Sequence, residues 1–442
     1  MKSILLKIFI ITVLLSSWTT VSWSQTVLNK SNAVQIALEN NFDIRIADNN
    51  VDAARNNASI KNSNYLPSVS ASGTANFAWS DTETTLQDGS IRAVDGVSTQ
   101  RYNANIGLNY TIFDGFGREN LYNSLKENYN LSELQARSVI ENSLVNIFAG
   151  YYEVARLTEN EINQQQTLNI SRERLQRAKY GFEYGQSTQL DVLNAEVDYN
   201  SDSINYLTIV QQLENQKRNL NLLLGRDVEI KYLIDTTLTY AENLDLESIK
   251  EKAVLNNVNI LLAEANLRDS EYQIKAISAA RIPKIGLTAA YGATLNQLGP
   301  TSFADKQSLL GPSVGASLSW NIFDGGSTNV RRQNSKINME NQWVAVEQAQ
   351  LNLSRNVSNA WNIYKTALFV MEAERTNLRT NQRNFDRTVE QYGLGQISSI
   401  EFRQAQINLL NAELNYNQAK YSAKIAELAL YQLSGELMQA DF

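Results

Sequence analysis

The side chains that most often perform chemistry in proteins are missing from this chain: its 442 residues include no Cys and no His. Without Cys there can be no disulfide, thiolate metal site or cysteine nucleophile. Without His the commonest general base and transition-metal ligand are lost. A carboxylate-based hydrolase is the remaining enzymatic alternative, but no compact motif of paired acidic residues supports it. We therefore expect no catalytic residue, no metal site and no cofactor.

The net charge and the N-terminus narrow the class of protein further. A formal charge of −7 argues against nucleic acid as a partner. Residues 1–24 have the pattern of a secretory signal peptide: Lys2 and Lys7 form a positive region ahead of a short apolar run at 8–15, and Ser22 and Ser24 suit a cleavage site. The run is too short to cross a membrane. We therefore expect an exported chain that is soluble in the periplasm, secreted, or inserted as a β-barrel.

Four segments have the composition of membrane strands, because apolar and polar side chains alternate along them with period two. They comprise residues 68–80, 102–113, 285–296 and 313–323. None contains Asp, Glu, Lys or Arg, although 19% of the chain is charged, and a charge that faces lipid costs about 2–4 kcal/mol at the bilayer centre. Their length suits strands that cross a membrane at a tilt. We favour a membrane β-barrel over a soluble, half-buried sheet.

Aromatic and Pro residues add detail to these segments. Five aromatic residues are candidates for the membrane–water interface: Trp79, Tyr102, Tyr110, Tyr291 and Trp320. The four Pro are expected at the edges of the strands or in the loop between two of them, outside every predicted helix: Pro67, Pro283, Pro300 and Pro312.

The remaining elements are helices, two of them very long. Residues 118–180 contain one Gly and no Pro, and residues 327–391 contain neither. At the rise of an α-helix, each could extend about 100 Å. Shorter helices are predicted for 31–64, 187–224, 248–281 and 398–434. Their apolar residues form narrow seams beside polar faces, which suits a hollow tube of helices or, as an alternative, a solid coiled-coil spacer.

An internal duplication organises these elements. The strand entry at 66–69 recurs at 282–285, and the strand exit Ile-Phe-Asp-Gly at 112–115 recurs at 322–325. Each repeat runs helix, strand, strand, long helix, helix. We divide the chain into the signal peptide (1–24), repeat 1 (25–225), an inter-repeat segment (226–247), repeat 2 (248–435) and a C-terminal tail (436–442). The inter-repeat segment and the tail are expected to form a belt around the middle of the helices.

The strand count predicts an oligomer. Four strands cannot close a barrel, and backbone polar groups cannot stay unpaired in lipid. The chain must therefore pool strands with copies of itself. Three copies would supply twelve strands and an open lumen, and would surround it with twelve helical staves; a dimer with eight strands is the competing count.

With these features, the chain resembles the TolC-like outer-membrane factors over essentially its whole mature length. The duplicated plan, the two Ile-Phe-Asp-Gly exits and the Gly-rich motifs at 180–187 and 392–397 carry the resemblance. It implies a membrane α+β fold in which a trimer forms a 12-stranded transmembrane β-barrel, continued by a 12-helix periplasmic α-barrel. It also implies docking to a periplasmic adaptor (membrane fusion) protein and an inner-membrane pump, in the outer membrane of a Gram-negative bacterium.

The resemblance assigns roles to residues where the long helices reverse. The adaptor-docking tips would comprise Gly181, Gly185, Gln186, Gly393, Leu394, Gly395 and Gln396. The periplasmic gate would comprise Tyr392, Glu401, Gln404, Asp191 and Asn194, with Gln404 standing where members often carry Asp. Glu401 fits a ring of like charge that attracts cations. Its plainer alternative is a carboxylate that stabilises a helix N-terminus, and the same holds for Asp191.

Two functions follow from these expectations. The first is a passive exit duct of a tripartite efflux or type I secretion system, which moves solutes from the periplasm or a pump to the exterior. The second is a trimeric structural or adhesive stalk that spans the periplasm and conducts nothing. The transported cargo is not encoded in any motif of the chain, although the absence of Cys and His disfavours a dedicated metal relay.

Overall fold

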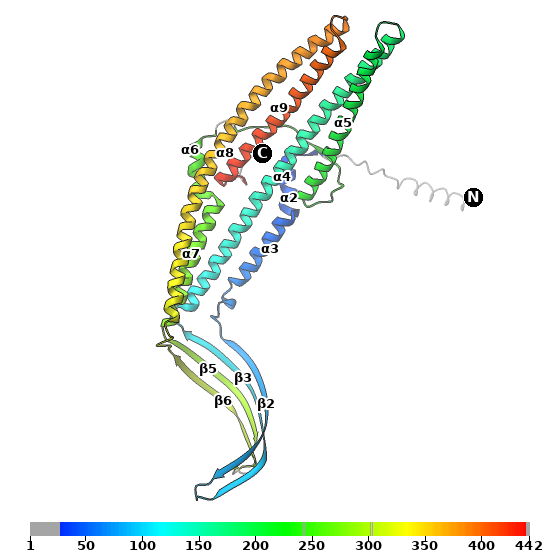
Figure 1. Cartoon of the computed structure of the whole chain (residues 1–442). Helices are drawn as coiled ribbons and strands as arrows, with labels where there is room; N and C mark the ends of the chain where they lie inside the picture. Colours follow the sequence, from blue (N-terminus) through cyan, green and yellow to red (C-terminus); the bar gives the residue numbers. More distant parts are fainter. Residues whose placement is uncertain (1–26, 242–243, 301, 303, 439–442) are drawn as a thin grey trace, which may run out of the picture. The chain divides into compact units, whose positions relative to one another are not determined.

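The computed structural model describes residues 27–438 except 242, 243, 301 and 303 (Figure 1). The predicted signal peptide and residues 439–442 of the tail lie outside the described residues. The chain divides into two compact units. The described part of the first comprises residues 27–45, 140–249 and 357–438, and the second comprises residues 46–139 and 250–356.

The chain contains two series of elements in the same order. Each series consists of two shorter helices, two strands, a long helix and a further helix. The first series is α2 (Lys30–Asn40), α3 (Phe42–Asn57), β2 (Ser68–Thr85), β3 (Ile91–Phe113), α4 (Gly117–Glu183) and α5 (Gln189–Leu223). The second series is α6 (Leu246–Asn256), α7 (Val258–Ser278), β5 (Lys284–Gln297), β6 (Lys306–Ser319), α8 (Ser327–Gly393) and α9 (Ser399–Ser434). Two short strands, β1 (Val27–Leu28) and β4 (Leu233–Ile234), and two 3-10 turns complete the described elements.

The second unit contains an antiparallel sheet in the order β2-β3-β5-β6 (Figure 1). Its register joins apolar residues across all four strands, for example Ala71 opposite Ile106, and Ile106 opposite Tyr291. The opposite face is polar: the Ser72 hydroxyl donates to Asn105 Oδ1 at 2.8 Å, and similar bonds join neighbouring rows. The apolar residues are exposed in the single chain, so one face of the sheet is oily and uncovered.

The strands extend beyond the predicted segments at the hairpin end. β2 continues to Thr85 and β3 begins at Ile91, not at residue 102, and the extension carries charged residues such as Asp81 and Arg92. The backbone hydrogen bonds between β2 and β3 continue through this extension. The strands therefore do not end where charged residues begin. The prediction for 313–323 is shifted: β6 is Lys306–Ser319, because Ser319 pairs with Lys284, the first residue of β5. Residues 320–323 have no partner strand.

One Pro lies where it was not expected. Pro312 is inside β6, opposite Tyr291 of β5, and not at the edge of a strand or in a loop. Within the chain β6 is the outer strand of the sheet and is paired on one side only, and Pro in a sheet is found mainly in such strands.

The shorter helices predicted as single segments at 31–64 and 248–281 are each broken near an Asn. Between α2 and α3, the Asn41 side-chain oxygen accepts hydrogen bonds from the backbone N–H groups of Asp43 and Ile44. Between α6 and α7, Asn257 caps α7 in the same way, accepting from Asn259 N at 3.0 Å. An Asn that satisfies the free N–H groups of a new helix competes with helix continuation, which explains both breaks.

The long helices α4 and α8 run without interruption, as their lack of Pro predicts. Each has 67 residues, which corresponds to about 100 Å at the rise of an α-helix. Within the described residues, no helix combines the length and the apolar character needed to cross a membrane.

The core of the first unit lies around Tyr151 and Tyr152 of α4. The Tyr151 hydroxyl donates to the carbonyls of Leu28 and Asp235, which ties together the short parallel strands β1 and β4. The described part of the inter-repeat segment also contacts α9, where Lys424 Nζ donates to the Thr239 carbonyl at 2.7 Å.

Candidate functional site

The two helical hairpins, α4–α5 and α8–α9, end in turns of the same construction. At the first turn, Gly185 N donates to the Phe182 carbonyl and Gln186 N to the Gly181 carbonyl; at the second, Gly395 and Gln396 make the equivalent bonds. Gly185 and Gly395 have φ values of +72° and +70°. This paired bonding is the Schellman ending of a helix, which needs a left-handed residue and therefore favours Gly.

The two other tip glycines differ in what they contact. A Cβ on Gly181 would approach the Ser187 hydroxyl to 2.4 Å, so the backbone needs a residue without a side chain there. A Cβ on Gly393 would meet nothing within 4 Å. Leu394 is 72% exposed beside it. The tips therefore present backbone and an uncovered leucine to their surroundings.

The two acidic residues of the predicted gate, Glu401 and Asp191, take part in helix caps. The Glu401 carboxylate accepts from the backbone N–H and the hydroxyl of Ser398, both at 2.8 Å, and Asp191 makes the same bonds with Thr188. These are capping boxes at the starts of α9 and α5. The bonds from Ser398, first that from its backbone, hold the pKa of Glu401 below its usual value, and those from Thr188 do the same to the pKa of Asp191. Both carboxylates therefore remain charged at neutral pH.

The other predicted gate residues have distinct surroundings. Tyr392 is half-buried and packs on Phe402, with ring centroids 4.6 Å apart, while the Arg177 guanidinium lies 5.4 Å from its ring centre. Gln404 is exposed and donates to Asn408 at 2.9 Å, and Asn194 is exposed on α5. The structure thus brings Tyr392 into a packed cluster and leaves Glu401, Gln404 and Asn194 at the surface of the single chain.

A buried polar network near the tips was not predicted from the sequence. Arg403 of α9 reaches Asp202 of α5 through two bonds, at 2.6 and 2.8 Å, and Ser171 of α4 donates to the same carboxylate. Arg174 of α4 donates to Asp198 of α5 and to the Ser399 carbonyl. Asp198 and Asp202 lie four residues apart, so they share one face of α5. That spacing was the one available signal, but nothing local identifies Arg403 as their partner.

The predicted interfacial aromatics lie at different levels of the sheet. Tyr102 pairs with Ala75 and Leu295, and Tyr110 pairs with Leu287 nearer the helical end of the strands. Trp79 lies beyond Tyr102 on the hairpin side, opposite Ser98. Trp320 follows β6 and donates to the Arg281 carbonyl at 3.1 Å. Tyr291 lies halfway between the levels of Tyr102 and Tyr110, so the register does not place it at a boundary.

The region around the helical tips does not present a metal-binding site among its described residues. Across the part of the chain that the structure describes, no group of three or more acidic side chains is placed to hold a metal ion. The candidate site therefore consists of turns, capped carboxylates and a network of ion pairs, an arrangement suited to docking and to an electrostatic filter.

Comparison with known proteins places this architecture in context. The sequence profile described as outer membrane efflux protein matches residues 33–226 and 250–436. The chain is 23% identical over 425 residues to the outer membrane efflux protein BepC of Brucella suis, covering 95% of this chain and 88% of that one. It is 26% identical over 413 residues to the toluene efflux pump outer membrane protein TtgC of Pseudomonas putida, covering 91% and 82%.

Solved structures share the fold. The CmeC outer membrane channel of Campylobacter jejuni superposes with a TM-score of 0.78 at 18% identity, covering 95% of this chain and 90% of that chain. A membrane protein from Pseudomonas aeruginosa gives a TM-score of 0.76 at 19% identity, covering 95% and 94%.

Proposed function

Because the chain belongs to the outer membrane efflux protein family, we propose that three copies of it form a passive duct that carries solutes from the periplasm to the exterior. The predicted resemblance to the TolC-like factors is thereby confirmed. Membership also makes the chain an outer-membrane transport protein of a Gram-negative cell and not an enzyme. The trimer, the closed barrel and the partner proteins belong to the proposal.

The observation that carries the proposal is the two-faced sheet. Its apolar face is exposed in the single chain, and its outer strands, β2 and β6, each have one edge without a partner within the sheet. An apolar face favours lipid, but unpaired strand edges cannot remain in it. Pairing β6 of one copy with β2 of the next satisfies both requirements. Three copies give twelve strands around an open lumen, whereas eight strands would leave an interior filled by side chains.

We further infer that repeat 1 (25–225) and repeat 2 (248–435) are duplicates joined by segment 226–247. The same order of elements in both halves supports this, as do the two separate matches to one family profile. Each repeat would contribute a long helix and a set of shorter ones to the wall of a periplasmic tube. The tube continues the lumen of the barrel toward the inner membrane.

The hairpin tips are proposed to dock a periplasmic adaptor protein joined to an inner-membrane pump. The uncovered Leu394 and the open backbone around Gly185 and Gly395 support this assignment. The relative TtgC is named as part of a toluene efflux pump, which supports a pump as the partner here. The energy for transport then comes from the pump, and the duct itself is passive. A type I secretion system would use the same duct.

Glu401 is proposed to serve as both cap and filter. In a ring of three copies, three ionised Glu401 carboxylates would attract cations and repel anions at the periplasmic mouth. Tyr392, Gln404, Asp191 and Asn194 would line the same mouth.

Conductance in planar lipid bilayers tests the function. We expect stepwise ion conductance with a preference for cations and a block by multivalent cations. Glu401→Gln should weaken both preference and block, because Gln can still accept the cap hydrogen bonds but carries no charge. Glu251→Gln, an exposed carboxylate change on α6, serves as the matched control and should alter neither.

The alternative, a stalk without conductance, predicts folded and membrane-inserted protein that passes no current. That result would refute the duct. Unchanged cation preference in Glu401→Gln would instead leave the duct standing and remove the filter.

A further inference from the structure

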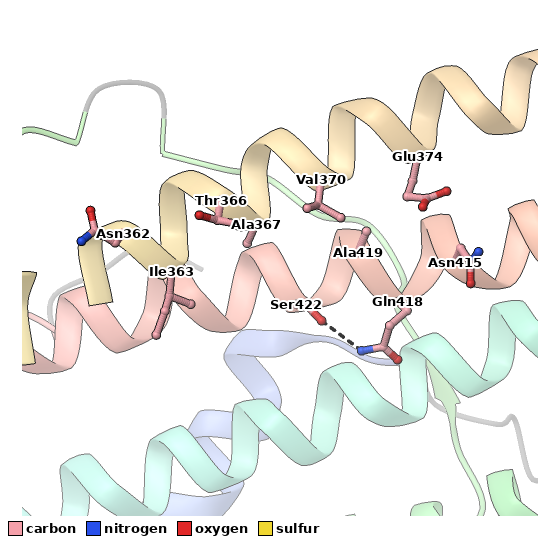
Figure 2. Close-up of a pocket in the computed structure, with 10 residues that line it drawn as sticks. All are labelled: Asn362, Ile363, Thr366, Ala367, Val370, Glu374, Asn415, Gln418, Ala419 and Ser422. Atoms are coloured by element: carbon pink, nitrogen blue, oxygen red, sulfur yellow. Dashed lines mark hydrogen bonds between the residues drawn. The ribbon is translucent and has the colours of Figure 1, made fainter. Parts of the chain in front are cut away.

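The chain offers a solute two surfaces of different chemistry. The groove between α8 and α9, about 650 Å³ in volume, is lined by amides and by apolar side chains such as Ile363, Val370 and Ala419 (Figure 2). Among the described residues that line it, Glu374 is the charged one. The polar face of the sheet instead combines hydrogen-bonded polar side chains with positive charge. A solute that carries an anionic group therefore finds a complementary charge on the sheet and not in the groove.

The regular part of the sheet contains basic residues but no acidic ones. This part extends from the helical end of the strands to the irregularity between Ser80 and Thr82 of β2. Its charged residues are Arg101 of β3, Lys284 of β5 and Lys306 of β6. The regular part comprises residues 68–80, 97–113, 284–297 and 306–319.

Strand register and alternation place Arg101 on the polar face of the sheet. Arg101 lies opposite Asn76 of β2 and Asn296 of β5. Two positions further along β3, the Asn103 amide donates to Thr74 Oγ1 at 3.1 Å in the next polar row. Side chains two positions apart on a strand point to the same side of the sheet. The Arg101 side chain therefore belongs to the face on which these polar rows lie.

The other two cations occupy different places. Lys306 lies opposite Gln297, one position from Asn296, so alternation puts Lys306 on the apolar face. Lys284 shares the polar face with Arg101, but it is twelve positions from Asn296 along β5 (296 − 284 = 12), or about 40 Å at the rise of a strand. Arg101 thus supplies the positive charge of the polar face near the hairpin end of the regular sheet.

Amide side chains hold the Arg101 guanidinium on one side and leave the other side free. Arg101 Nε donates to Asn296 Oδ1 at 3.1 Å, and Asn296 Nδ2 donates in turn to Gln307 Oε1 at 3.1 Å. Asn296 is 9% exposed, so this support is buried. Within the described residues, the two terminal nitrogens of Arg101 make no hydrogen bond and no carboxylate pairs with them. Neutral amides therefore orient the guanidinium without reducing its charge.

The acidic residues around the hairpins lie outside the regular part of the sheet. Asp81 is five positions past Asn76 on β2, about 17 Å along the strand. Asp95 is six positions from Arg101 on β3, about 20 Å. Asp305 precedes β6, which is two strand spacings, about 10 Å, from β3. Screening at physiological salt acts over about 8 Å, so the charge of Arg101 is largely uncompensated.

We propose that Arg101 binds the anionic groups of solutes in the lumen of the proposed duct. The free side of the guanidinium offers parallel N–H donors that fit carboxylate, sulfate and phosphate groups. The inference rests on the proposed function, because the polar face encloses a lumen only in a closed barrel. Symmetry would then bring three Arg101 side chains to one level, and the low-dielectric wall would strengthen their field. Solutes with an oxyanion group are the substrate class that this position adds.

The two faces of the sheet distinguish a solute from a lipid as the source of the anionic group. The phosphate of a lipid headgroup can reach Lys306 on the apolar face, whereas the sheet itself separates Arg101 from lipid. Lys306 is therefore the matched control for Arg101, because both are cations near the same end of the sheet and they differ in the face that they occupy.

Binding of a soluble anion tests the inference. The probe is pyranine, a fluorescent trisulfonate, and its fluorescence anisotropy with the detergent-solubilised protein measures the affinity. Arg101→Gln should weaken binding about ten-fold, because it removes charge-assisted hydrogen bonds. Arg101→Lys keeps the charge but not the parallel donors, and it should weaken binding less. Lys306→Gln should bind pyranine as the unaltered chain does.

A carboxylate placed beside Arg101 tests the role of its free charge without removing the residue. Asn296→Asp preserves the size of the side chain and the acceptor for Arg101 Nε, but it adds a negative charge that pairs with the guanidinium. This variant should weaken pyranine binding as much as Arg101→Gln does. Single-channel conductance in planar bilayers should persist in all of these variants, which verifies that each one folds and inserts.

The outcomes separate this inference from the proposed function. A conducting protein that binds pyranine equally well with and without Arg101 overturns the anion site alone. The same conclusion follows if Lys306→Gln weakens binding as much as Arg101→Gln, or if Asn296→Asp leaves binding unchanged. Absence of conductance in the unaltered chain overturns the proposed function, on which the lumen depends.

Discussion

At the scale of single residues, the surroundings of two acidic side chains on α9 shift their pKa values in opposite directions. Glu401 at the start of α9 is exposed, and the hydrogen bonds of its capping box lower its pKa. Glu413, three turns further along, is desolvated by burial, which raises its pKa to about 7. One residue therefore supplies a permanent charge at the tip, while the other titrates near neutral pH.

The raised pKa of Glu413 predicts a pH-dependent stability. Because the folded pKa lies above the ordinary value of 4.5, folding favours the protonated carboxyl. This contribution is complete below pH 4.5 and is lost as the pH rises through about 7. Because Glu413 is only partly buried, solvent screening reduces the effect of this shift, and Glu413→Gln should raise stability at pH 8 by about 1–2 kcal/mol and leave it nearly unchanged at pH 4.

Thermal unfolding of detergent-solubilised protein at pH 4 and pH 8 measures this effect. Glu251→Gln, an exposed change on α6, is the control and should not alter the difference between the two pH values. An equal difference in Glu413→Gln and the unaltered chain would show that Glu413 is not the group responsible.

At the scale of elements, each strand of the proposed barrel would separate lipid from water by the direction of alternate side chains. Ala71 of β2 belongs to the apolar face and lies opposite Ile106, while its neighbour Ser70 belongs to the polar face and lies opposite Gly107. The two residues differ by one position along the strand but face opposite solvents. Their separation into two environments can therefore be tested within one strand.

Arg substitutions at these neighbours should have unequal effects. Ala71→Arg places a charge in lipid and should cost about 2–4 kcal/mol near the bilayer centre, with most of the protein lost from the outer-membrane fraction. Ser70→Arg would point into the water-filled lumen of the proposed barrel and should retain insertion. Quantitative immunoblots of membrane fractions make the measurement. Equal loss in both variants would contradict the assignment of faces.

At the scale of the whole molecule, the proposed function gives the chain two tasks, to form a duct and to engage a pump. The exposed tip residue Leu394 is proposed for docking and lies outside the strands that are proposed to join the copies. Conductance and pump-dependent efflux should therefore be separable. A substitution at the tip should be able to stop pump-dependent efflux while conductance continues.

Leu394→Asp should abolish pump-dependent efflux in cells, because it puts a hydrated charge into an apolar docking contact. Its single-channel conductance in bilayers should equal that of the unaltered protein. Leu255→Asp on α6, where the leucine is similarly exposed at 71%, is the control and should retain efflux. Normal efflux in Leu394→Asp would exclude this leucine from docking.

Local patterns in the sequence determined the types of element and their order. Alternation without charge marked the region of each strand, and the absence of Pro from 118–180 and 327–391 predicted the long helices. Gly185 and Gly395 marked the reversals between helices. These features are set by neighbouring residues, because backbone conformation and side-chain period are local properties. The extent of β3 beyond Tyr102 was missed, because strand pairing continues without an apolar face.

Contacts between distant parts of the chain decided the rest. The Asn41 break joins α2 and α3 to the end of α5, where its amide donates to the Leu223 carbonyl. Arg403 finds Asp202 from 201 residues away, and Pro312 is accepted because β6 lies at the edge of the sheet. No local pattern specifies such partners, since each depends on which surfaces the fold brings together. The sequence alone thus set what each segment forms, and the tertiary structure decided what each segment touches.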